Sequence, residues 1–212
     1  MKIVAALTDP GLAAEAEAQG ADMIELRLDL MEGDSASRLA ACRKATRLPI
    51  IGTLRSAKEG GRYFGSADEW IAFLRPLLPY LDFVDIEQRY AGHAPEIRDA
   101  GKTIIASFHT PAMPPLFGLF GLERELRAYG DIVKIIATPR TDEDIIELIS
   151  FTHAVKLPVC TGVMGSEFRY ARPVLALFGS ELVYCHLGTP TAEGQFSVKE
   201  FTGLMLMLGH RN

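Results

Sequence analysis

Eight short runs of β-forming residues recur along the chain, and segments with helical patterning separate them. The runs begin near residues 2, 23, 50, 83, 103, 132, 158 and 182, and they read KIVAAL, MIELRLDL, IIGTLR, FVDIE, TIIASFH, IVKIIAT, PVCTGVM and LVYCHLG. Parallel strands need a crossover connection, which is usually a helix, so this alternation predicts a parallel sheet. Eight such units favour a closed (β/α)8 TIM barrel over an open doubly wound sheet.

The chain length of 212 residues predicts a single domain over residues 1–212, near the lower size limit of such barrels. Several helical segments place a hydroxyl residue three positions ahead of an acid, the pattern of a capping box: Ser66 to Glu69, Thr141 to Asp144 and Ser197 to Glu200. The sequence has no G-x-x-x-x-G-K-[ST] motif and no G-x-G-x-x-G in the first predicted βα turn. P-loop and dinucleotide-binding functions therefore lose their main support.

Composition argues against several kinds of partner. The formal net charge is -5, and no Lys/Arg cluster follows one face, so nucleic acid and anionic membrane surfaces are poorly supported. The three cysteines are widely spaced without a CxxC motif, which argues against disulfides or a zinc site and favours a reducing cytoplasm. The apolar run Ile3–Leu7 is too short for a signal-peptide core, and no apolar stretch reaches the ~18 residues of a membrane span. We therefore expect a soluble, cytoplasmic protein.

Polar residues alternate with apolar ones in the second predicted strand. In a barrel strand one set of side chains meets the helices, and the other set fills the interior. The apolar set, expected to face the helices, is Ile24, Leu26, Leu28 and Leu30, which leaves Glu25, Arg27 and Asp29 pointing inward. Three charges inside a barrel form either a mutually satisfied ion network or part of a functional site.

Lys134 interrupts the apolar run DIVKIIAT at residues 131–138, which is typical of a strand buried on both faces. Lysine is almost never fully buried without a partner. Either a carboxylate, such as Asp85 or Glu87 of the fourth strand, neutralises it, or desolvation lowers its pKa and frees the amine for chemistry.

The same alternation places Arg55 at the end of the third predicted strand and His109 at the end of the fifth, converging with Lys134 on one face. Active sites of barrel enzymes are assembled at this face, where the strands end. A buried amine that forms an imine with a ketone, together with a histidine that moves protons, is the minimum apparatus for α-proton abstraction.

Seven motifs follow one another along nearly the whole chain: IELRLD at 24–29, TLRSAKEGG at 53–61, SFH at 107–109, DIVKIIATP at 131–139, MGSEFRYAR at 164–172, FGS at 178–180 and TAEGQ at 191–195. With these motifs the chain resembles the type I 3-dehydroquinate dehydratases, which are Schiff-base enzymes of the shikimate pathway. The RSAKEGG run and the lysine strand are specific in this order and spacing.

The resemblance implies dehydration of 3-dehydroquinate to 3-dehydroshikimate, a step of aromatic amino acid biosynthesis, with no cofactor and no metal. It implies that Lys134 forms the imine, that His109 is the general acid/base, and that Glu59 orients the histidine. The substrate-binding set that it implies is Glu25, Arg27, Arg55, Met164, Arg172, Thr191, Ala192 and Gln195, with Arg172 expected to meet the substrate carboxylate through two parallel hydrogen bonds. A homodimer is expected on the same ground.

The sequence departs from the family pattern after the seventh predicted strand. The pattern is similar to M-G-x-x-G-x-x-S-R, but Phe168 replaces the second glycine and Ala171 replaces the serine. Thr191 and Glu193 replace the serine and proline of the usual S-A-P-G-Q lid. We expect a lid that keeps a hydroxyl, gains a charge and loses stiffness.

Two other functions fit parts of the pattern. A class I aldolase of the same architecture would use the same lysine, but phosphate-handling barrels usually build a site from glycine-rich loops after strands seven and eight. Here those loops supply Arg172 and Gln195. A barrel without activity that keeps the pocket as a binding module is the other alternative, because fold does not guarantee function.

Overall fold

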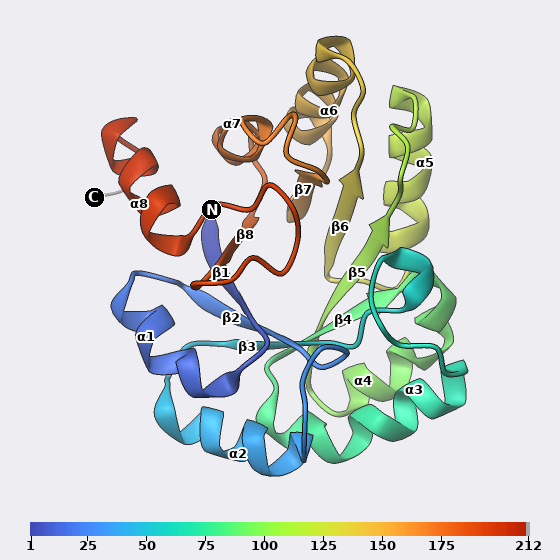
Figure 1. The fold of residues 1–212 in the computed structure, drawn as a ribbon. Helices are drawn as coiled ribbons and strands as arrows, with labels where there is room; N and C mark the ends of the chain where they lie inside the picture. Colours follow the sequence, from blue (N-terminus) through green and yellow to red (C-terminus); the bar gives the residue numbers. More distant parts are fainter. Residues whose placement is uncertain (211–212) are drawn as a thin grey trace.

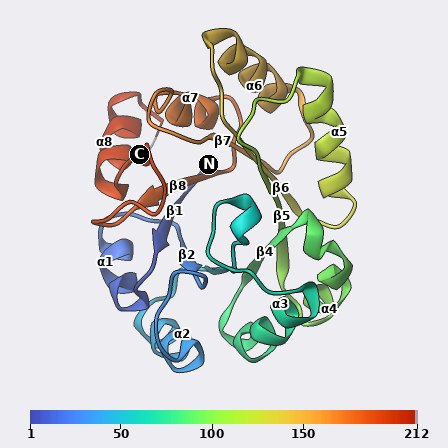
Figure 2. The same ribbon diagram turned by 45° about the vertical axis from the view of Figure 1, so that its right-hand side comes forward.

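The structure is a computed structural model that describes residues 1–210. Eight parallel strands surround a common axis, and helices cover them on the outside (Figures 1 and 2). The strands are β1 (Lys2–Leu7), β2 (Met23–Arg27), β3 (Ile50–Thr53), β4 (Phe83–Glu87), β5 (Thr103–His109), β6 (Ile132–Ala137), β7 (Val159–Val163) and β8 (Leu182–His186). Each begins at, or one residue from, the predicted position, and the predicted (β/α)8 barrel is confirmed.

Each strand is followed by a helix. These are α1 (Ala13–Ala18), α2 (Ser35–Ala45), α3 (Ala67–Leu74), α4 (Ala94–Asp99), α5 (Leu116–Arg127), α6 (Asp142–Ala154), α7 (Ala171–Leu177) and α8 (Val198–Met207). Short 3-10 helices precede or follow some of them: η1 (Pro10–Leu12), η2 (Ala57–Glu59), η3 (Arg75–Tyr80) and η4 (Gln88–His93). The three predicted capping boxes form at the starts of α3, α6 and α8. Among the described residues, no helix is long and apolar enough to cross a membrane.

The barrel closes at a seam between β7 and β8, which are the two ends of the strand order β7-β6-β5-β4-β3-β2-β1-β8. At this seam the buried Ser180 hydroxyl accepts a hydrogen bond from the Thr161 amide at 3.0 Å and donates one to the Thr161 carbonyl at 3.1 Å. The Glu181 amide donates to the Val159 carbonyl at 2.7 Å. Side-chain and loop contacts thus replace part of a regular ladder and keep the ring closed.

The core has an outer layer between sheet and helices and an inner plug. The outer layer contains Ile24, Leu26 and Leu28, as the alternation predicted. The inner plug comes from the first halves of the strands and consists mainly of Val4, Met23, Ile51, Ile105, Ile132, Cys160 and Leu182. Burial of a large apolar side chain contributes about 1.5–3 kcal/mol. The plug therefore stabilises one end of the barrel and leaves the other end for polar groups.

The alternation in the second strand stops earlier than expected. β2 ends at Arg27, and Asp29 and Leu30 lie in the turn that follows it. Leu30 is only partly buried and is not a core residue of the barrel wall. Asp29 turns back, and its carboxylate accepts two hydrogen bonds from the Arg27 guanidinium, at 2.9 and 2.8 Å.

Candidate active site

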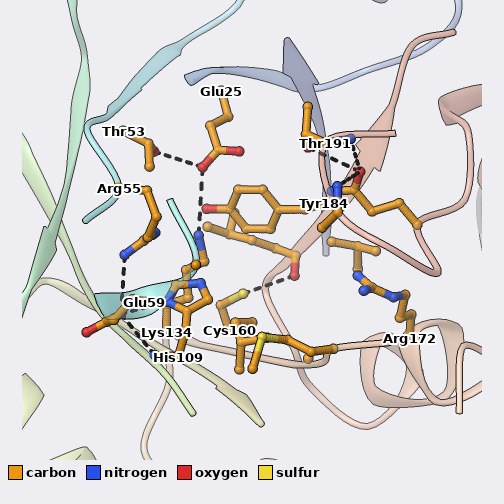
Figure 3. A pocket seen from close by; sticks show the side chains of 18 of the residues that line it. Glu25, Thr53, Arg55, Glu59, His109, Lys134, Cys160, Arg172, Tyr184 and Thr191 are labelled. Carbon is orange, nitrogen blue, oxygen red and sulfur yellow. Dashed lines mark hydrogen bonds and ion pairs between the residues drawn. The ribbon is translucent and has the colours of Figure 1, made fainter. Parts of the chain in front are cut away.

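A cavity of about 160 Å³ opens at the carboxyl ends of the strands (Figure 3). All the residues predicted from the sequence to form a site line it: Glu25, Arg27, Arg55, Glu59, His109, Lys134, Met164, Arg172, Thr191, Ala192 and Gln195. They come from six strands or their following loops, so the fold brings together residues that lie far apart in sequence.

Lys134 lies in the middle of β6, is 4% exposed, and directs its amine into the cavity. Its Nζ donates a hydrogen bond to Asp85 Oδ2 at 3.0 Å and lies 3.8 Å from Glu25 Oε1. The carboxylate partner considered from the sequence is therefore present. The amine nonetheless lines the cavity, so the ion pair does not remove it from the reach of a ligand.

Arg55 connects the carboxylates around the lysine. It lies just past the end of β3, and its guanidinium donates to Asp85 Oδ1 at 2.8 Å, Glu87 Oε1 at 3.0 Å and Ser107 Oγ at 3.0 Å. Burial by itself would raise the pKa of Asp85, but the positive charges of Arg55 and Lys134 outweigh it and lower that pKa. Asp85 is thus held as a carboxylate beneath the lysine.

His109, the last residue of β5, pairs with Glu59 of η2. Glu59 Oε2 accepts a hydrogen bond from the His109 backbone amide at 3.0 Å and lies 2.9 Å from ring Nδ1. The other ring nitrogen, Nε2, is left for a ligand in the cavity. Burial, helped by the charges of Arg55 and Lys134, lowers the pKa of His109 well below its ordinary value. The ring is therefore neutral near pH 7, as a general base requires.

The pKa of the Glu59 carboxyl is raised, whereas that of its partner His109 is lowered. Burial raises the pKa of Glu59 to about 8; nearby Glu87 and Asp85 reinforce the rise, and Arg55 opposes it. Its Oε2 lies 3.4 Å from an Arg55 nitrogen. The Glu59 carboxyl therefore changes its protonation near pH 8 while its partner His109 stays neutral, and such perturbed groups are characteristic of acid/base sites.

Glycines after η2 hold Glu59 in place. Gly60 has φ +83°, a left-handed conformation that favours glycine. Gly61 packs against the backbone of Arg55: a Cβ added there would lie 2.1 Å from the Arg55 carbonyl oxygen. The loop folds back at this point, because the Gly61 amide donates to the Ser56 carbonyl at 2.8 Å.

Substitution of Gly61 with alanine is expected to destabilise the protein by about 1–3 kcal/mol, because the new methyl group overpacks a backbone contact. It is also expected to lower activity, since the displaced loop carries Glu59. Gly92→Ala is the matched control, because a Cβ there meets nothing within 4 Å. Urea unfolding and steady-state assays of both variants check this. Equal effects of the two substitutions would contradict it.

Arg172, near the start of α7, has a buried Nε that finds no hydrogen-bond partner among the described residues. Its Nη2 donates a 3.3 Å hydrogen bond to the Glu193 carbonyl. Burial lowers the pKa of this guanidinium. A buried, incompletely bonded guanidinium facing a cavity is suited to bind a carboxylate with two parallel hydrogen bonds.

The loop after β8 closes over the cavity and is tied down at several points. Gln195 Oε1 accepts hydrogen bonds from the Thr191 amide at 2.9 Å, the Thr191 hydroxyl at 3.2 Å and the Ala192 amide at 3.2 Å. The Glu193 carboxylate accepts a hydrogen bond from the Ser166 hydroxyl at 2.8 Å. The acid that stands in place of the family's proline therefore connects this loop to the loop after β7. The Thr191 hydroxyl thus donates its hydrogen bond to another residue of the same loop.

The other two departures from the family pattern are part of the core. Phe168 is 8% exposed and Ala171 is fully buried, and both belong to the apolar cluster beneath α5, α6 and α7. These substitutions fill space beside the site and leave Arg172 at the cavity wall.

Some residues that line the cavity were not predicted from the sequence, notably Tyr184 and Cys160. Tyr184 is the third residue of β8, and its ring centre lies 3.9 Å from Lys134 Nζ. The alternation could have found it, because Leu182 and Tyr184 share a face of this strand. Aromatic residues are common in strands, so a tyrosine at this position does not by itself indicate a functional site.

The fold and the cavity together define the class of this protein: a (β/α)8-barrel enzyme with its active site at the carboxyl ends of the strands. The family model for type I 3-dehydroquinase matches residues 9–212. The chain is 62% identical over 208 residues to the 3-dehydroquinate dehydratase of Methanoregula boonei, covering 98% of this chain and 100% of that protein. The chain therefore belongs to the type I 3-dehydroquinase family of hydro-lyases, as its motifs predicted.

Other relatives support the same family. The 3-dehydroquinate dehydratase of Methanospirillum hungatei is 38% identical over 210 residues, covering 99% of this chain and 80% of that protein. Among solved structures, the 3-dehydroquinate dehydratase from Aquifex aeolicus superposes with a TM-score of 0.82 at 27% identity, covering 98% of each chain.

Proposed function

We propose that this protein dehydrates 3-dehydroquinate to 3-dehydroshikimate through an imine on Lys134. The observation that carries the proposal is the placement of one buried amine in a cavity shared with a neutral histidine. The family membership and the names of the relatives supply the substrate. The same proposal assigns the protein to the shikimate pathway.

The first step joins Lys134 to the substrate. Its Nζ loses a proton and attacks the ketone carbon; a C–N bond forms, and the ketone oxygen leaves as water. The positive charge of the ammonium is thereby replaced by that of the iminium. Asp85 and Glu25, at 3.0 and 3.8 Å from Nζ, stabilise either cation without rearrangement.

In the second step His109 moves the protons. We assign to its Nε2 the removal of a proton from the carbon beside the iminium, whose electron pair then forms an enamine. The imidazolium returns a proton to the β-hydroxyl, which leaves as water. Hydrolysis of the imine releases the product and the free amine. Glu59 holds the histidine ring through Nδ1.

The remaining wall residues would bind the substrate. We assign the carboxylate to Arg172, whose buried Nε has no partner within the described chain. Arg27 and Arg55 already pair with protein carboxylates, so they would add positive potential and fixed hydrogen-bonding groups rather than free charge. The other proposed contacts are Glu25, Met164, Thr191, Ala192 and Gln195. The homodimer stays a prediction from the family resemblance, and the cytoplasmic location stays a prediction from the cysteine usage and the short N-terminal apolar run.

Glu59→Gln is expected to change the pH dependence of kcat/KM. In the wild type, Glu59 is protonated below about pH 8, and its ionisation lets Nδ1 keep the ring proton, which frees Nε2 as the base. The rate of proton abstraction should therefore rise with pH through about 8. An amide does not ionise, so this rise should vanish in the variant.

The measurement is kcat/KM from pH 6 to about 9, bracketing the perturbed pKa. Glu147→Gln on the exposed face of α6 is the matched control, and it should keep the wild-type profile. A Glu59→Gln profile that overlays the wild type would show that the orienting role is wrong.

Product formation tests the function directly. 3-Dehydroshikimate contains a conjugated enone, so its appearance from 3-dehydroquinate is followed by ultraviolet absorbance. A panel of sugar phosphates tests the aldolase alternative in the same preparation. Turnover of a sugar phosphate without turnover of 3-dehydroquinate would overturn the proposal.

A further inference from the structure

Tyr184, like Arg172, lines the cavity and has a buried polar atom without a hydrogen-bond partner among residues 1–210. Its hydroxyl oxygen is buried and unpaired within the part of the chain that the structure describes. Its ring lies over the amine of Lys134, with the ring centre 3.9 Å from Nζ (Figure 3). Buried hydroxyl groups are nearly always hydrogen-bonded, because an unpaired one costs free energy. A hydroxyl that has its hydrogen-bond partner in a bound ligand would account for this unpaired position.

The surroundings of the hydroxyl limit what it can bind. Burial raises the pKa of Tyr184 well above its ordinary value, and the nearby Glu25 carboxylate adds to the effect. The O–H therefore keeps its proton and acts as a hydrogen-bond donor. Figure 3 shows the hydroxyl end of the ring on the side of Glu25 and Lys134. Glu25 already accepts from Thr53 at 2.8 Å, and as a carboxylate it can accept further hydrogen bonds.

A ligand hydroxyl satisfies both groups, because it can accept from Tyr184 and donate to Glu25 at once. A ketone oxygen only accepts, and it would face the negative charge of Glu25. The ring centre lies 3.9 Å from Nζ and the hydroxyl stands at the ring edge, so the hydroxyl is offset from the carbon that the amine attacks.

We propose that Tyr184 is a specificity-determining residue whose hydroxyl donates a hydrogen bond to the substrate hydroxyl on the carbon adjacent to the ketone. Glu25 accepts a hydrogen bond from the same substrate hydroxyl. 3-Dehydroquinate carries such an α-hydroxyl at C4. The inference rests on the proposed function and deepens it, because it selects α-hydroxy ketones over ketones that lack this group.

The test compares Tyr184→Phe with Tyr90→Phe. Tyr90 is the matched control, because its hydroxyl is also buried and unpaired within residues 1–210. Its ring, however, lies in the core, stacked on Trp70 and outside the cavity. With 3-dehydroquinate, Tyr184→Phe should lower kcat/KM roughly three- to tenfold, the worth of one net hydrogen bond, mainly through KM. Tyr90→Phe should leave kcat/KM unchanged. Neither should lower Tm, because each removes an unpaired hydroxyl.

A substrate analogue without the C4 hydroxyl distinguishes binding from a structural effect. Wild type and Tyr184→Phe should turn over this 4-deoxy analogue with equal kcat/KM. An unchanged kcat/KM of Tyr184→Phe with 3-dehydroquinate, or an equal loss with both substrates, would overturn the inference while leaving the proposed function in place. Failure of the wild type to dehydrate 3-dehydroquinate would overturn both.

Discussion

Replacing Lys134 with arginine is expected to abolish turnover of 3-dehydroquinate, with a fall in kcat of roughly 10⁴- to 10⁶-fold, as for enzymes that lose a covalent nucleophile. Arginine keeps the positive charge that Asp85 and Glu25 require, so the carboxylates of the cavity stay paired. A guanidinium, however, stays protonated and does not form the imine. The loss therefore reports on the amine itself.

Lys134→Ala is the companion variant. It should be equally inactive but less stable, because it leaves the buried Asp85 with one cation fewer; breaking a buried ion pair costs about 3–5 kcal/mol. Absorbance assays measure turnover, and urea unfolding measures stability. Substantial turnover by a folded Lys134→Arg protein would contradict the covalent route.

Replacing His109 with alanine is expected to lower kcat by about 10²- to 10⁴-fold, the usual contribution of a positioned acid/base group. The expected effect on imine formation is much smaller, because His109 moves protons after Lys134 has joined the substrate. The variant should therefore still trap substrate on Lys134 when borohydride is added. This separation of turnover from trapping distinguishes proton transfer from nucleophilic attack.

His109→Asn controls for the structural part of the effect. The alanine variant leaves the Glu59 carboxyl without its ring contact, although the backbone amide of residue 109 still donates to it at 3.0 Å. Asparagine restores a polar side chain without a base. Both variants should be similarly slow in steady-state assays. A His109→Asn protein with near-normal kcat, or an alanine variant that fails to trap substrate although folded, would refute the assignment.

The barrel was predictable because its signals are local. The starts of the strands follow from short β-rich runs, and the starts of α3, α6 and α8 follow from capping boxes that form as the sequence indicates. The end of the second strand was not predictable in this way. The alternation continues through Asp29 and Leu30, but Asp29 bonds to the Arg27 guanidinium, and the chain turns there.

The convergence of Lys134, His109 and Arg55 was also predictable, because side-chain alternation fixes which residues face the interior. Their mutual bonding was not. Ser107 stands opposite Lys134 in the register of β5 and β6, and Glu87 stands opposite Ser107 in that of β4 and β5. Such pairs depend on the register between neighbouring strands, and the spacing of residues within one strand does not determine that register.

The role of Arg55 illustrates the difference. Its motif indicated a substrate-binding residue, whereas in the structure its guanidinium is bonded to Asp85, Glu87 and Ser107. The motif placed the residue correctly in the cavity wall. The packing of β3 against β4 and β5 determines how many guanidinium N–H groups of Arg55 already donate to protein acceptors.

Borohydride reduction of the wild-type protein in the presence of 3-dehydroquinate tests the imine most directly. If the substrate forms an imine with Lys134, we expect irreversible loss of activity, one stable adduct by intact mass, and modification of the peptide that contains Lys134. Inactivation should require both substrate and borohydride. An unmodified Lys134 peptide recovered from protein that turns over 3-dehydroquinate normally would contradict imine formation.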